Sequence, residues 1–101
     1  MREFLRGAVR LHILHHAARA PVHGAWMAGE LAHHGYRISP GSLYPTLHKM
    51  ESEGLLRSSH EVVDGRTRRS YRATAKGRRT LEATKGQLRE LADEVLGDEA
   101  T

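Results

Sequence analysis

Basic side chains gather between Arg66 and Arg79, a stretch with seven lysines and arginines and no acidic residue. Three of them, Arg66, Arg68 and Arg69, directly follow an Asp-Gly dipeptide, which favours a two-residue β-hairpin turn. Guanidinium groups at a hairpin tip can clamp phosphates or enter the minor groove, whose narrow A·T tracts attract them. The spacing therefore predicts contact with a polyanion, and double-stranded DNA is the partner we expect.

The residues before this hairpin favour a helix with one apolar face. Leu43, Leu47 and Met50 follow one another at intervals of four and three, so they form a stripe directed to the core. The other side carries polar groups near the start of the helix, where recognition helices reach the edges of bases. The predicted DNA contacts here are Ser39, Ser42, Tyr44, Pro45, Thr46, His48 and Lys49. Their hydroxyl, imidazole and ammonium groups can bond bases or phosphates, and the proline can touch a thymine methyl.

The start of this helix can be interpreted in two ways. Ser39 followed by Pro40 fits an N-cap with proline at the first helical position. Alternatively, Ser42 is the cap, which places Pro45 in the first turn, where its missing N–H loses no hydrogen bond.

The eight histidines among the 101 residues are a second group of side chains that could bind a ligand or a proton. His12 and His16 lie one helical turn apart, a spacing that can hold a divalent metal or respond to pH near neutrality. No third ligand of obvious geometry accompanies them, so we expect neither a metal site nor a cofactor. Trp26, the single tryptophan, either belongs to the core or lines an effector pocket with Met27, His12 and His16.

Other classes of function are disfavoured. No Ser-His-Asp arrangement, phosphate loop or paired-carboxylate site can be assembled, because Glu51 and Glu53 do not face each other on a helix. We therefore expect no enzymatic activity. The chain has no cysteine, which excludes disulfides and thiolate metal sites. No apolar run is long enough to cross a bilayer and no signal peptide is visible, so we expect a cytoplasmic protein without membrane contact.

Apolar spacing and turn residues predict the order of the elements that position these side chains. The chain should form three helices, a two-stranded hairpin and a long last helix. The predicted ranges are Phe4–Arg19, Gly24–His34, a helix from Ser39 or Ser42 to Gly54, strands Leu55–Val62 and Thr67–Ala73, and Ala75 to about Leu96. This order is typical of a winged helix-turn-helix: mostly α, with a small β wing.

The last helix is the candidate for self-association. Leu81, Leu88, Leu91 and Val95 follow a heptad-like seam. Three helices and a hairpin already make a complete small domain, so we expect this helix to find nothing to pack against in its own chain. We therefore divide the chain into a DNA-binding part, 1–74, and a dimerisation helix with an acidic tail, 75–101. A chain of this length gains stability by dimerising.

Three segments resemble the PadR family of bacterial transcriptional regulators: HGAWMAGEL, SPGSLYPTLHKMESEGLL and DGRTRRSYRATAKG. The resemblance covers about residues 5 to 80, and its most specific part is Gly41 to Leu56. It implies a dimeric winged helix-turn-helix, usually a repressor, of the branch with a short C-terminal helix. By this resemblance Ser42, Tyr44 and Pro45 belong to the recognition helix, and Gly65 with Arg66 to the wing tip.

Two positions depart from the family pattern. Ala25 and Trp26 stand where a tyrosine usually follows the His-Gly pair, and His60 stands where a tryptophan is frequent. In some members aromatic residues near the dimer interface bind flat organic effectors. We therefore predict a homodimeric, sequence-specific regulator of an inverted-repeat operator, a repressor released by a small effector. The alternative is a metal- or ligand-binding sensor that uses its histidine clusters.

Overall fold

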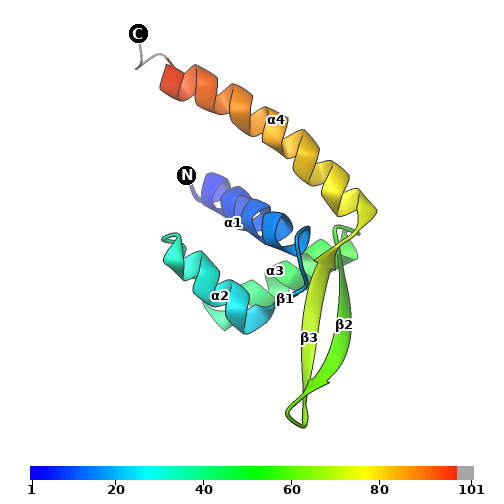
Figure 1. Cartoon of the computed structure of the whole chain (residues 1–101). Helices are drawn as coiled ribbons and strands as arrows, with labels where there is room; N and C mark the ends of the chain where they lie inside the picture. Colours follow the sequence, from blue (N-terminus) through cyan, green and yellow to red (C-terminus); the bar gives the residue numbers. More distant parts are fainter. Residues whose placement is uncertain (98–101) are drawn as a thin grey trace.

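The computed structural model describes residues 1–97, which contain four helices and one three-stranded antiparallel sheet. The elements are α1 (Arg2–Ala17), β1 (Val22–His23), α2 (Gly24–His33), α3 (Pro40–Ser52), β2 (Leu56–Val63), β3 (Arg66–Ala73) and α4 (Ala75–Gly97). The predicted winged helix-turn-helix is confirmed: the β2–β3 hairpin projects from the helices as the wing (Figure 1). The end of the predicted acidic tail, 98–101, lies outside the described residues.

Local sequence explains where the first helices end. α1 ends at Ala17, two residues earlier than predicted, and Pro21 follows it closely. Gly35 has a φ of +91°, the left-handed conformation that closes many helices and that glycine adopts without strain. It follows the end of α2, which closes at His33, one residue before the predicted His34. Within residues 1–97, no helix combines the length and the apolar character that a bilayer crossing requires.

The sheet has the order β1-β3-β2. At the wing tip, Asp64 and Gly65 have φ of +52° and +76°, as a type I′ turn requires, and Val63 pairs with Arg66. The hairpin prediction is therefore confirmed. β1 was not predicted, because two residues cannot display the alternation that identifies a strand. It is held by tertiary pairing, Val22 opposite Tyr71.

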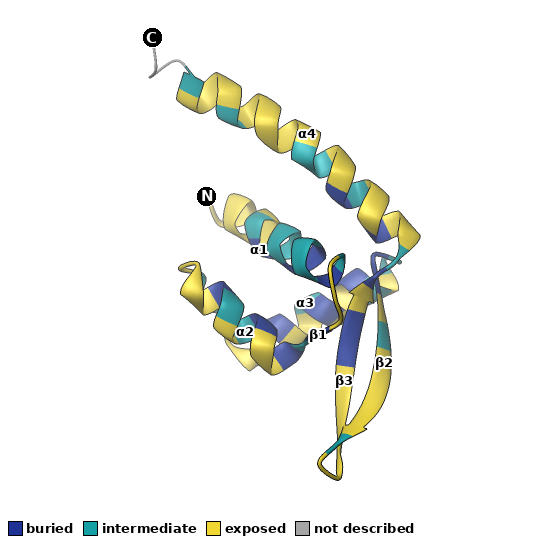
Figure 2. Cartoon of the chain, viewed as in Figure 1, coloured by how far each residue is buried: buried dark blue, intermediate teal, exposed yellow. Residues whose placement is uncertain are grey.

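The core lies where the three short helices meet the base of the sheet. Leu43, Leu47 and Met50 are fully buried, so the predicted stripe of α3 is confirmed. Tyr71 of β3 is 1% exposed and belongs to the same core, although its hydroxyl has no hydrogen-bond partner among the described residues. Burial is confined to the base of the wing, and its distal half is exposed (Figure 2).

The prediction that α4 has no packing partner in its own chain is wrong for its first half. Thr74 caps the helix: its Oγ1 accepts from the Gly77 amide at 3.0 Å and donates to the Gly54 carbonyl. Leu81 is 5% exposed and belongs to the core. Leu81 therefore cannot serve as a dimer contact, since its side chain is already buried within the chain. The second half of α4 runs alongside α1 at a distance (Figure 1), and its large apolar side chains stay exposed.

Candidate nucleic-acid interface

The start of α3 sets the position of its polar side chains. Ser39 is the N-cap and Pro40 the first helical residue, so the alternative cap at Ser42 is wrong. The Ser39 hydroxyl makes no capping bond to the helix and instead lies 3.4 Å from the Ser42 hydroxyl. Pro45 stands inside the helix, and the Thr46 hydroxyl donates to the Ser42 carbonyl at 2.8 Å. The Thr46 hydroxyl proton is thus used in this hydrogen bond, whereas its oxygen can still accept a hydrogen bond from another donor.

The predicted contact residues of α3 lie on one continuous surface. Ser39, Ser42, Tyr44, Pro45, His48 and Lys49 are exposed, and Thr46 is half-buried. They lie on the side of the helix away from the buried stripe. This follows because a helix turns by about 100° at each residue. This surface has two edges. Ser42, Thr46 and Lys49 lie toward α1, whereas Tyr44 and His48 lie toward α2 and the wing.

Tyr44 is held by a close approach that the sequence analysis missed. A Cβ placed on Gly24, the first residue of α2, would come within 2.6 to 2.8 Å of the Tyr44 ring and hydroxyl. The ring therefore packs on the start of α2, while 42% of the residue stays exposed. The signal was present as the His-Gly pair, but nothing local to Gly24 indicates that a tyrosine twenty residues later needs the space.

The wing approaches α3 through Arg69. Its Nη1 lies 3.4 Å from Nε2 of His48, and its carbonyl lies 3.4 Å from Nδ1 of His23. Strand side chains alternate between faces, so Arg69 shares the core-facing side with Tyr71, whereas Arg66 and Arg68 belong to the opposite side. All three arginines are exposed. The structure therefore brings Arg69 to α3 and leaves the other two near the wing tip.

A second link fixes the angle between α3 and the wing. The Glu51 carboxylate accepts from the Ser58 hydroxyl at 2.7 Å and from the Ser58 amide at 2.9 Å. These bonds, the hydroxyl first, lower the pKa of Glu51 from its ordinary value. In the sequence, Glu51 stands out only as one of two carboxylates that do not face each other. Its observed contacts are those of a residue that ties α3 to β2.

Comparison with known proteins identifies this arrangement. The model of the transcriptional regulator PadR-like family matches residues 13–83. The chain belongs to the PadR-like family. It is 63% identical over 100 residues to the transcriptional regulator Rv3488 of Mycobacterium tuberculosis, covering 99% of this chain and 94% of that protein.

Solved structures agree with this assignment. A PadR family transcriptional regulator from Eggerthella lenta superposes with a TM-score of 0.82 at 33% identity, covering 98% of this chain and 88% of that one. A PadR-like transcriptional regulator from Bacillus cereus reaches 0.85 at 29% identity, with 94% of each chain covered. This PadR-like protein is a DNA-binding winged-helix transcriptional regulator.

The histidines of this PadR-like protein line the contact between α1 and α2. The His12 ring stacks on His34 at 5.1 Å, and Glu30 lies 2.9 Å from His34 and 3.7 Å from His16. Burial, followed by neighbouring histidines, lowers the pKa of both His12 and His16. Within residues 1–97, no three histidine or acidic residues are grouped so that they could hold a metal ion.

The four residues predicted to bind an effector are not brought together. Met27 is fully buried in the core and cannot line a surface pocket. Trp26 is 48% exposed, so its interpretation as a core residue is wrong, and its ring meets the edge of His16 at 5.2 Å. His12 instead contacts Tyr36 and His34. Of the four, Trp26 and the partly buried His16 form a contacting pair, and their role toward an effector stays a prediction.

The predicted dimerisation residues fall into two sets. Leu88, Leu91 and Val95 are 46%, 44% and 56% exposed, whereas Leu81 is buried. A groove of about 230 Å³ runs between α1 and this part of α4, and its walls include Phe4 and Leu88. The exposed residues of α4 therefore continue into an exposed apolar part of α1.

Proposed function

We propose that this PadR-like protein is a homodimeric repressor that places two copies of α3 in successive major grooves of an inverted-repeat operator. The observation that carries this proposal is the continuous surface of α3 and the wing, joined at His48 and Arg69. Two-fold symmetry then requires half-sites about one helical turn apart, near 34 Å.

The exposed stripe of α4 supports the dimer. Leu88, Leu91 and Val95 remain accessible although the same helix is buried at its start. Adjacent Phe4 is 51% exposed, so the partner's α4 can cover apolar surface on both helices. Replacing Leu88 and Leu91 by glutamate should yield a monomer in sedimentation experiments and weaken operator binding, because two half-sites are no longer bound together. A variant that remains dimeric would contradict this interface.

The wing supplies contacts that do not depend on sequence. Replacing Arg66, Arg68 and Arg69 by alanine should weaken binding to every duplex and lower the salt dependence by about 0.9 for each phosphate that is no longer neutralised. The measurement is fluorescence anisotropy with a labelled fragment of the protein's own promoter at several salt concentrations. Wild-type affinity of this triple variant in moderate salt would overturn the wing assignment.

The start of α3 supplies discrimination between sequences. Ser42→Ala or Thr46→Ala should change the ratio of affinities for the operator and a scrambled duplex, with the salt dependence nearly unchanged. The two groups of variants therefore separate contacts to phosphates from contacts to bases. An equal decrease in affinity for operator and scrambled DNA would remove Ser42 and Thr46 from the base contacts.

Release of the repressor by a small effector is the final part of the proposal. Trp26 is half-exposed beside His16, so a flat ligand bound there would change its fluorescence. We expect compounds that release the operator to alter this emission, and His16→Ala to weaken the response. Unchanged emission with a compound that does release DNA would exclude this site.

A further inference from the structure

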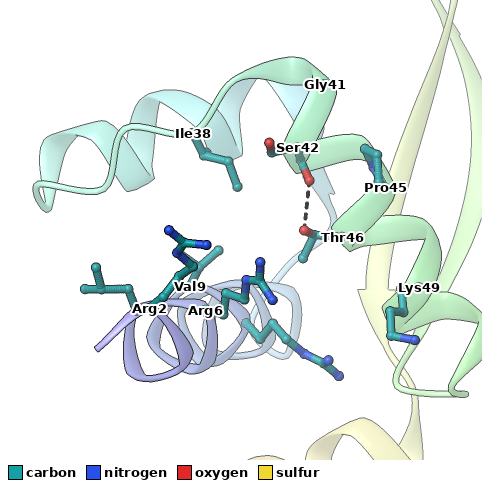
Figure 3. A pocket seen from close by; sticks show the side chains of 11 residues that line it. Arg2, Arg6, Val9, Ile38, Gly41, Ser42, Pro45, Thr46 and Lys49 are labelled. Carbon is teal, nitrogen blue, oxygen red and sulfur yellow. Dashed lines mark hydrogen bonds between the residues drawn. The ribbon is translucent and has the colours of Figure 1, made fainter.

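A groove of about 620 Å³ separates the first half of α1 from α3. Its walls are drawn in Figure 3, where the side chains of Arg2 and Arg6 extend from α1 toward Ser42 and Thr46 of α3. Apolar side chains, among them Val9 and Ile38, also line it. The groove therefore lies along the edge of the recognition helix that the wing does not reach.

The charge of this groove is positive. Arg2, Arg6 and Arg10 repeat every fourth residue, so they lie along one face of α1, and Lys49 joins them from α3. Arg10 is neutralised by an ion pair with Glu53 at the end of α3. Within residues 1–97, no carboxylate forms an ion pair with Arg2, Arg6 or Lys49. Three cations are thus available beside α3.

These cations lie on one flank of α3 and the wing lies on the other. The groove includes Ser42, Thr46 and Lys49, whereas Arg69 of the wing meets His48 on the far edge. A helix seated in a major groove about 12 Å wide has a phosphate backbone on each side. The wing accounts for contacts on one side only.

We propose that Arg2 and Arg6, together with Lys49, bind phosphates of the DNA backbone that runs along the α1 side of α3. This inference rests on the proposed function, because it assumes that α3 enters the major groove. The wing and the start of α1 then hold the recognition helix from both flanks. The ion pair between Arg10 and Glu53 is a positioning contact, since it joins α1 to the end of α3.

The test compares two double variants that each remove two charges one helical turn apart. Arg2→Ala with Arg6→Ala removes them from the groove, and Lys85→Ala with Arg89→Ala removes them from α4. Affinity is measured for operator and scrambled duplexes between about 50 and 200 mM salt. The groove variant should bind both duplexes about 10- to 100-fold more weakly, and its salt slope should fall by about 2. The α4 variant should match wild type.

Circular dichroism and sedimentation must first show that both variants are folded and associate like wild type. The conservative change of Arg2 and Arg6 to lysine should retain most of the salt slope, because the charge is kept. If the salt slope of these lysine variants fell as far as that of the alanine variants, a phosphate contact by charge would be ruled out.

The outcomes separate this inference from the proposed function. If the groove variant binds DNA like wild type while the wing variant is impaired, the inference fails and the proposed function stands. If both variants bind like wild type, both fail. If anilinonaphthalene sulfonate binds wild type but not the groove variant while operator affinity is unchanged, the groove is a pocket for an amphipathic anion and the phosphate proposal is overturned.

Discussion

The two halves of α4 share one helix and one apolar seam but have different surroundings. In the first half, Gly77 and Leu81 are buried against the rest of the chain. In the second half, Leu88, Leu91 and Val95 remain 44 to 56% exposed. The helix is continuous through both halves, from Ala75 to Gly97. Local helix formation is therefore the same, and only the neighbouring elements differ.

This difference shows how one helix can serve two purposes. Near its start, a Cβ on Gly77 would lie 2.2 Å from the Leu55 carbonyl oxygen and 3.4 Å from Leu14, so backbone and core come into direct contact. Farther along, the groove lined by Phe4 and Leu88 separates α4 from α1, and the apolar residues of α4 stay exposed. The first half stabilises the fold of each chain, and the second half is the one that we propose for association.

Leu81→Ala tests the comparison with the largest expected effect. It should lower the free energy of unfolding by about 2–5 kcal/mol, because it removes a buried side chain and leaves a cavity. Leu91→Ala, the same change in the second half, should act mainly through association and depend on protein concentration. Urea unfolding at two concentrations measures both. An equal destabilisation of both variants at every concentration would contradict the proposed difference, in which the first half stabilises the fold and the second half mediates association.

Gly77→Ala should destabilise the protein by about 1–3 kcal/mol, since the new methyl group overlaps the Leu55 carbonyl and α4 must move. The change should also disturb the Thr74 cap, whose Oγ1 accepts from the Gly77 amide. Urea unfolding measures the decrease in stability. Wild-type stability would mean that α4 is held less closely than its contacts indicate.

Acidification should weaken the fold through the histidines between α1 and α2. Since burial lowers the pKa of His12 and His16 below 6.5 in the folded chain, the unfolded chain binds more protons below that pH. Their contribution to stability is complete above about pH 6.5 and declines as the pH falls through that value. Replacing both histidines by glutamine should flatten the decline in urea unfolding between about pH 7 and 5.5. A wild-type protein that gains stability on acidification would contradict the assignment.

Gly86→Ala should have the smallest effect, and it should be favourable. Apart from the adjacent residues and the backbone of α4 itself, no atom lies within 4 Å of a Cβ at this position, so alanine should raise the free energy of unfolding by about 0.8–1 kcal/mol through its greater helix propensity. Thermal unfolding of a dilute sample measures the increase. A decrease in stability of the dilute sample would contradict the open surroundings of Gly86 and weaken the distinction between the two halves.

Much of the fold could be predicted because its signals are local. The spacing of Leu43, Leu47 and Met50 predicts which face of α3 is buried. The Asp64-Gly65 dipeptide predicts where the wing turns. Leu81 and Leu91 could not be distinguished in this way. Both belong to the same seam, and what covers each depends on elements far away in the chain.

The candidate site divides in the same manner. The polar residues of α3 and the wing arginines follow from composition and spacing, so the sequence could predict them. The support of Tyr44 by Gly24 and the tie between Glu51 and Ser58 could not be predicted, because each needs two elements at a known distance. The four-residue spacing of Arg2 and Arg6 was visible, but the element that faces them was not.

The amino-acid sequence by itself determined the helices, the hairpin turn, the basic character of the wing and the resemblance to PadR regulators, because these depend on neighbouring residues. Tertiary structure decided which apolar residues are covered, that Val22 and His23 form a strand, and that arginines of α1 lie beside α3. Packing brings together residues that are far apart in the chain. These tertiary contacts cannot be inferred from the local periodicity of the sequence.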